Sequence, residues 1–227
     1  ASRPSPVRAL TGSTGGRHSG SGGRAYRSAV SKSHTVRRAA ARASLNVARR
    51  FEAYALNNLA GYESEAGDPK QAVAYWEQAL ALLRAMGDLR TLVTPSLNLA
   101  SAQMELGEFD AAVAQLEELA RLCEQEGYGS HLGLALVQLG VARAAYGRTD
   151  EAIAAWERVL AEDGAPADAR AEALQLLALA HVRAGRPAAA LASLDRLAPA
   201  LLPRLAPAWR GDLAAARAAA LAALGRC

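Results

Sequence analysis

A glycine placed to end a helix recurs at nearly constant spacing through this sequence, and this repetition constrains the fold more than any other feature. The glycines are Gly67, Gly107, Gly147 and Gly185, so the successive intervals are 40, 40 and 38 residues. Units of this length stack on their neighbours to bury a continuous core. We therefore expect an array of similar units along the chain.

Several other positions repeat in register with these glycines. Eight residues before each glycine stands a leucine followed by a small residue: Leu59-Ala60, Leu99-Ala100, Leu139-Gly140 and Leu177-Ala178. Five residues after each glycine stands an alanine, followed by two further apolar positions: Ala72, Trp76, Ala79; Ala112, Leu116, Leu119; Ala152, Trp156, Val159; and Ala190, Leu194, Leu197. Small residues let two helices approach closely, while the larger ones fill the space to the next unit. Each unit is therefore predicted to be an antiparallel helix pair.

This series of a leucine-small pair, glycine, alanine and apolar residues resembles the tetratricopeptide repeat family. The resemblance implies an all-α solenoid of about four helical hairpins, over residues 53–89, 90–129, 130–165 and 166–198. The usual period is 34 residues. The period near 40 seen here is similar to that of kinesin light chains and of bacterial signalling regulators. An Ala-rich stretch over residues 208–225 is expected to cap the array.

The first 34 residues are rich in Ser, Gly and Arg and contain almost no apolar side chains, so we predict that residues 1–34 are disordered. From residue 35 the composition changes to mainly Ala, Arg, Leu and Val, without Gly or Pro until Gly61. This stretch predicts a leading helix over residues 35–52.

The formal net charge of +4 conceals a strong asymmetry, because eleven basic residues and no acidic ones precede Glu52. One interpretation is an organellar transit peptide, which favours a chloroplast or, failing that, a mitochondrion. A second is an arm that binds an anionic surface such as RNA or acidic lipid. A third is a linker in a longer bacterial protein. The predicted arm residues are Arg3, Arg8, Arg17, Arg24, Arg27, Lys32, Arg37 and Arg38.

We find no pattern typical of a catalytic centre, a metal site or a cofactor site. The four histidines are scattered and lack the i, i+4 spacing to a second ligand that a helical metal site needs. The Gly-rich run over residues 12–23 lacks the Gly-Lys-Ser/Thr ending of a phosphate loop. No apolar run is long enough to span a membrane. We therefore expect no enzyme activity, no metal and no cofactor.

The family resemblance implies that the first helices of the units line a groove for a peptide or an amphipathic helix of a partner protein. The predicted groove residues are Asn57, Asn58, Leu97, Asn98, Met104, Val137, Val141, Leu179 and Val182. The alternative is that Leu97, Val137 and Leu179 pack between helices. The basic residues that clamp a chaperone tail in some family members are missing here.

The first functional hypothesis is a non-catalytic scaffold that holds proteins during assembly or stabilisation of a larger organellar complex. A second is an RNA-associated factor that uses the basic arm to bind phosphate. A third is the repeat module of a bacterial regulator.

Overall fold

The chain is helical over almost all of the residues that the structure describes. The computed structural model describes residues 21–197 and 207–225, with side chains from residue 38 onward except at 40, 207–210 and 212. The helices are α1 (Ser21–Glu65), α2 (Pro69–Met86), α3 (Val93–Glu105), α4 (Phe109–Gln125), α5 (Gly129–Ala145), α6 (Thr149–Ala161), α7 (Ala167–Arg183), α8 (Pro187–Arg196) and α9 (Pro207–Ala223). None of these helices combines the length and apolarity needed to cross a membrane.

The chain divides into two units, residues 1–47 and residues 48–227. In the first unit α1 begins at Ser21, so residues 21–34 are helical where the sequence predicted disorder. The reason is that no Gly or Pro interrupts the chain between Arg24 and Ala60, so a helix formed further along continues toward the N-terminus. For the same reason the predicted leading helix does not end at residue 52. Residues 1–20 of the predicted disordered segment lie outside the described residues.

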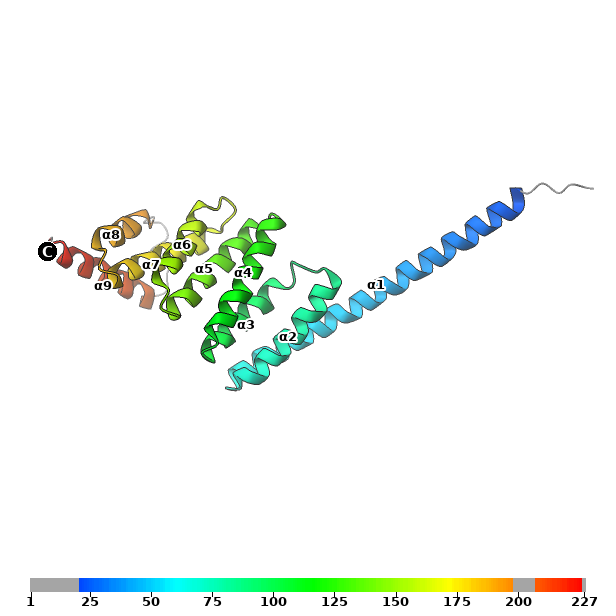
Figure 1. Ribbon diagram of the computed structural model, residues 1–227, viewed down its shortest axis with the longest axis horizontal. Coiled ribbons are helices and arrows are strands. Elements are labelled where there is room, and N and C mark those ends of the chain that lie inside the picture. The colour runs from blue at the N-terminus through cyan, green and yellow to red at the C-terminus, as the bar shows by residue number, and fades with distance from the viewer. Residues whose placement is uncertain (1–20, 198–206, 226–227) are drawn as a thin grey trace, which may run out of the picture. The chain divides into compact units, whose positions relative to one another are not determined.

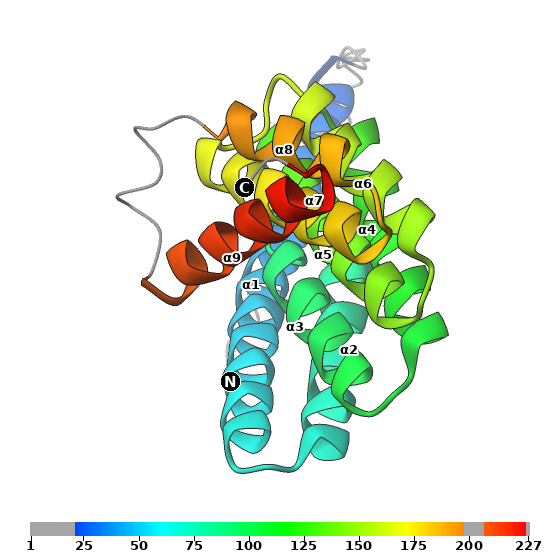
Figure 2. The same ribbon diagram turned by 90° about the vertical axis from the view of Figure 1, so that its left-hand side faces the viewer.

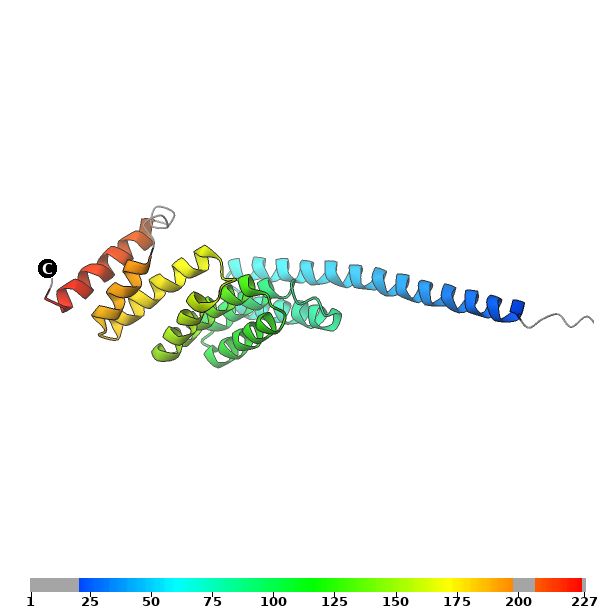
Figure 3. The same ribbon diagram turned by 90° about the horizontal axis from the view of Figure 1, so that it is seen from above.

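In the second unit the helices alternate in pairs: the C-terminal part of α1 with α2, α3 with α4, α5 with α6, and α7 with α8 (Figure 1). Each helix from α3 to α7 contacts the one before it and the one after it, which produces the row of neighbouring helices seen from above in Figure 3. The first helices of successive pairs also touch, α3 with α5 and α5 with α7. At the C-terminal end α9 lies against α7 and α8 (Figure 2).

The recurring glycines end the first helix of each pair. Gly67, Gly107, Gly147 and Gly185 have φ between 66° and 87°, the left-handed region that favours glycine. In all four cases the N–H of the next residue donates to the carbonyl oxygen five positions earlier, at 2.8 Å. This bond pairs a carbonyl that the helix end would leave free. The constant spacing in the sequence therefore reflects one turn used four times.

The small residues beside the repeated leucines, Ala60, Ala100, Gly140 and Ala178, are all buried. Gly140 is buried under the indole of Trp156, and a Cβ atom at Gly140 would overlap that ring. The indole N–H of Trp156 donates to the carbonyl oxygen of Val137 at 3.1 Å. In the first pair Trp76 is also buried, but the small residue there is Ala60. In the third pair, contact between the two helices thus rests on a small residue facing a large one.

Candidate protein-binding face

The first helices of the four pairs present a surface that we call the first-helix face. Positions i, i+4, i+7 and i+11 of a helix lie within about 60° of one another. On these helices they are Tyr54, Asn58, Gly61 and Glu65; Thr94, Asn98, Ser101 and Glu105; Leu134, Gln138, Val141 and Ala145; and Glu172, Leu176, Leu179 and Arg183. All sixteen residues are exposed or half-buried. Because α3 touches α5 and α5 touches α7, their stripes lie beside one another.

The nine groove residues predicted from the sequence fall into three environments. Asn58 is exposed, and Val137 is buried with 1% of its surface exposed. The remaining seven are half-buried: Asn57, Leu97, Asn98, Met104, Val141, Leu179 and Val182. Asn58, Asn98, Val141 and Leu179 belong to the first-helix face, and the other half-buried residues, Asn57, Leu97, Met104 and Val182, lie toward its edges.

Val137 is a core residue and does not line a groove, which corrects the prediction at this position. It lies one residue before Gln138, and a step of one residue turns a helix by about 100°, enough to move a side chain from the surface into the core. Asn57 occupies the equivalent place in the first pair, where its Oδ1 accepts a hydrogen bond from Trp76 Nε1 at 3.2 Å. Leu97, at the same position of α3, packs against the core. The alternative of packing between helices therefore holds for Val137.

Most residues of the first-helix face were not among the predicted groove residues, and three of them, Tyr54, Leu134 and Gln138, matter for binding. Tyr54 and Leu134 are 48% and 38% exposed, and Gln138 is half-buried. Tyr54 lies four residues before Asn58, and Leu134 four residues before Gln138, so each pair shares a helix face. Extending the predicted stripe by one helical turn would have found the first two.

A row of amides runs along this face at one position of the repeat. Asn58, Asn98 and Gln138 are separated by 40 residues each, and Leu176 follows in the fourth pair. None of the three amide side chains forms a hydrogen bond with another described residue within the second unit. A side-chain amide carries both a donor and an acceptor, so it can pair with a peptide group of another chain. We call these three residues the amide row.

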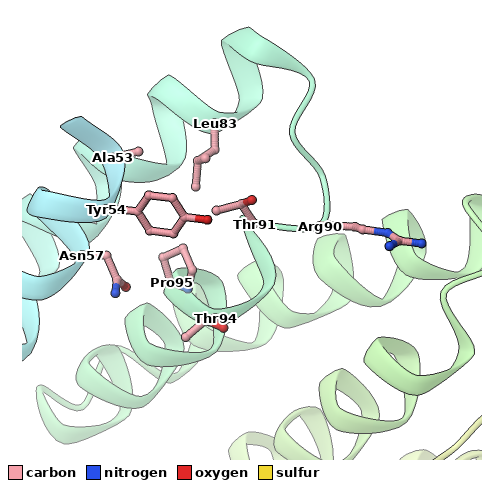
Figure 4. A pocket seen from close by; sticks show the side chains of 8 residues that line it. All are labelled: Ala53, Tyr54, Asn57, Leu83, Arg90, Thr91, Thr94 and Pro95. Carbon is pink, nitrogen blue, oxygen red and sulfur yellow. The ribbon is translucent and has the colours of Figure 1, made fainter. Parts of the chain in front are cut away.

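A pocket of about 350 Å³ opens beside the N-terminal end of the amide row (Figure 4). It is lined by Ala53, Tyr54, Asn57, Leu83, Arg90, Thr91, Thr94 and Pro95. Ala53, Leu83 and Pro95 supply apolar walls, and Figure 4 shows the Tyr54 hydroxyl directed toward Thr91. The pocket has the size and mixed lining to hold one side chain of a bound segment.

The loop that forms this pocket is held by Asp88. Its Oδ1 accepts a hydrogen bond from the Thr91 hydroxyl at 2.9 Å, and its Oδ2 lies 2.8 Å from a guanidinium nitrogen of Arg50. Nearby, the Arg90 guanidinium stacks 5.1 Å from the centre of the Tyr128 ring. These contacts position the α2–α3 loop against α1 and against Tyr128, the residue that precedes α5.

Ion pairs in repeat register connect successive units away from the first-helix face. Arg148 lies 3.2 Å from Asp110, and Arg186 lies 2.8 Å from Asp150. Each arginine follows a helix-ending glycine, and each aspartate is in the first turn of the preceding second helix. Exposed pairs of this kind contribute little free energy, so their effect is mainly on the register between units.

The perturbed titratable groups of the described chain do not converge on one place. Burial, and secondarily Asp168, raises the pKa of Glu172. Burial raises the pKa of the Cys123 thiol. Burial and Arg186 lower the pKa of His181, against an opposing effect of Glu157. Among the described residues no group of three or more His, Cys, Asp or Glu side chains is placed to hold a metal ion.

The predicted anionic-surface arm falls largely beyond the described side chains. Arg3, Arg8 and Arg17 lie outside the described residues. The backbone of Arg24, Arg27, Lys32 and Arg37 belongs to α1, and the side chain of Arg38 is exposed. The arm stays a prediction.

Comparison with known proteins identifies the fold. Residues 134–163, which cover most of α5 and all of α6, match the tetratricopeptide repeat family. Residues 134–163 form a tetratricopeptide repeat. The prediction of this family and of an all-α solenoid is thus confirmed. No curated protein sequence is detectably similar to the chain.

Several solved structures share this fold. One solved structure contains the nearly identical tetratricopeptide-like repeats of a Podospora anserina protein assigned as a kinesin light chain. Its sequence is 21% identical to this chain, with a TM-score of 0.60 over 76% of this chain and 92% of that one. A Rap protein complexed with competence and sporulation factor is 18% identical, with a TM-score of 0.57 over 65% of this chain and 42% of that one. MamA protein is 17% identical, with a TM-score of 0.50 over 77% of this chain and 93% of that one. At these identities the similarity defines the fold alone.

Proposed function

We propose that this protein is a non-catalytic scaffold that binds an extended segment of another protein along the first-helix face. The observation that carries the proposal is the amide row of Asn58, Asn98 and Gln138. Amides at a regular spacing can pair with the backbone of an extended segment whatever its side chains are. Such binding suits a scaffold that must hold a segment in one direction and register.

Apolar groups beside the amide row would supply most of the binding energy. Tyr54 and Leu134 are exposed, and Val141, Leu176 and Leu179 are half-buried. Covering apolar surface contributes about 25 cal/mol per Å² before the cost of ordering the partner. The solved Rap protein with its bound factor supports the proposal, since that structure pairs this fold with a bound partner.

We further propose that the scaffold serves assembly or stabilisation of a larger complex in an organelle, with a chloroplast preferred to a mitochondrion. The support is the acid-free, Ser- and Arg-rich composition before Glu52. The repeat module of a bacterial regulator is the competing proposal from the same fold.

The same eleven basic residues favour RNA association as a second candidate function. It predicts RNA binding that weakens steeply as salt rises, because each phosphate contact releases counterions. Replacing Arg24, Arg27 and Lys32 with Gln should reduce that salt dependence. Binding to RNA that is unchanged by these substitutions would contradict this candidate.

A paired set of variants tests the scaffold proposal. Val141→Glu with Leu179→Glu places two charges on the first-helix face and should abolish partner capture from native extract. Ala154→Glu with Ala188→Glu is the matched control, because both alanines are exposed on second helices. Both doubly substituted proteins should keep the helical circular dichroism of the wild type. Equal capture by the two variants would contradict the proposal.

A further inference from the structure

The exposed apolar surface of the described chain is concentrated on α1. Of the nine large apolar side chains that are more than a third exposed, six belong to this helix. Within residues 48–65 they are Phe51, Tyr54, Leu59 and Tyr62, and Tyr62 is 69% exposed. A surface helix that packs on only one side does not ordinarily carry so much aromatic surface.

Comparison with the later repeats shows which face of a first helix the exposed Leu59 and Tyr62 belong to. Leu59 is 44% exposed, whereas its equivalents Leu99, Leu139 and Leu177 are 2% to 3% exposed. Tyr62 is equivalent to Ala102, Ala142 and Ala180, which are at most 7% exposed. In those pairs the first helix packs against the second helix of the preceding pair, as α3 does against α2. Leu59 and Tyr62 therefore lie on a stacking face, which we call the α1 edge.

The α1 edge has the spacing of a short coiled-coil seam. Glu52, Ala55, Leu59 and Tyr62 follow one another at intervals of three, four and three residues. This alternation places all four on one stripe of the helix. In an antiparallel pairing of two such stripes, Ala55 meets Leu59 of the other helix, and Glu52 meets Tyr62 of the other helix.

We propose that the α1 edge binds the α1 edge of a second copy of this chain, with the two helices antiparallel. The stripe is complementary to itself in this arrangement, because the Tyr62 hydroxyl can donate to the Glu52 carboxylate of the other copy. Arg49 and Glu63 flank the seam on the same side, and antiparallel pairing brings each beside the opposite charge of the other copy. Parallel pairing would not bring these two residues together, because they lie 14 positions apart along the helix.

The contact is short, so the dimer is expected only at high protein concentration. The seam from Glu52 to Tyr62 is about 15 Å long at 1.5 Å per residue. An interface built mainly on this contact is smaller than that of most stable complexes. The account therefore predicts a dimer that dissociates on dilution.

Sedimentation velocity of the full chain, from about 1 to about 200 µM, tests the proposal, because a small interface associates weakly. The wild type should pass from monomer to dimer, whereas Leu59→Glu and Tyr62→Glu should each stay monomeric. Leu134→Glu, which adds the same charge at an exposed residue of the first-helix face, should dimerise as the wild type does. A wild type that stays monomeric at the highest concentration would overturn the proposal, and so would a dimer that survives Leu59→Glu.

Charge reversal tests the antiparallel register. Arg49→Glu and Glu63→Arg should each weaken the dimer about tenfold. In a symmetric dimer residue 49 of each copy faces residue 63 of the other, so each substitution creates two pairs of like charge. An equimolar mixture of the two variants should form a heterodimer of wild-type strength, since both flanking pairs then carry opposite charges. A mixture no stronger than either variant alone would overturn the proposed register.

Discussion

At the scale of single residues, packing explains why the small residue after Leu139 in the third pair is a glycine, Gly140, and not an alanine. The Trp156 indole occupies the space that a Cβ atom at Gly140 would need. Gly140→Ala should therefore lower the free energy of unfolding by about 1–3 kcal/mol, the usual cost of overpacking a core. Urea denaturation followed by circular dichroism measures this change.

Gly61→Ala is the control for that substitution. Nothing lies within 4 Å of a Cβ atom built on Gly61, which is also in a first helix. Alanine there should raise the free energy of unfolding by about 0.5–1 kcal/mol, since glycine in a helix is entropically unfavourable. The packing account of Gly140 fails if both substitutions raise the free energy of unfolding.

His181 should make stability depend on pH. Its side chain is 8% exposed, and burial together with Arg186 holds its pKa below the usual 6.5, while Glu157 acts in the opposite direction. Because folding favours the neutral ring, the free energy of unfolding should fall as pH drops below 6.5. His181→Gln should lose less stability than the wild type between pH 7.5 and pH 5.5, measured by urea denaturation. Equal losses in the two proteins would contradict this account.

At the scale of the helix, the start of α2 depends on one side chain. Asp68 Oδ1 accepts a hydrogen bond from the backbone N–H of Gln71 at 3.0 Å, and Pro69 opens the helix. Asp68→Ala should lower the free energy of unfolding by about 0.5–2 kcal/mol, the usual cost of losing such a cap. Thermal denaturation of this variant beside Asp163→Ala, a change at an exposed loop aspartate, separates the cap from charge removal. The account requires that only the first substitution destabilises the protein.

The helices could be predicted from the sequence where local signals agree with the repeat. The glycine register predicts the turns after α1, α3, α5 and α7, because a left-handed residue favours glycine. The start of α1 differs from the prediction, because the Ser- and Gly-rich composition favours disorder whereas the lack of Gly and Pro over residues 24–60 allows the helix to continue. The candidate face was predicted only in part. Repeat register shows which residues are equivalent, but whether Val137 or Gln138 faces outward depends on how Trp156 packs.

At the scale of the whole molecule, the repeats distinguish core positions from the surface positions that we propose bind a partner. Apolar positions that recur in every pair, such as Leu99, Leu139 and Leu177, are buried. The amides at the neighbouring surface position recur in three pairs without such a structural need. The first-helix face is therefore where a partner is expected.

Photo-crosslinking from the first-helix face tests this central claim most directly. Benzoylphenylalanine would be placed at Gln138, in the amide row, or at Ala154, an exposed residue of α6, in the full chain. After irradiation in native extract, mass spectrometry would identify the adducts. The account predicts a discrete protein adduct from position 138, absent from position 154 and lost with Val141→Glu and Leu179→Glu. Adducts of equal yield from both positions, or from position 154 alone, would contradict it.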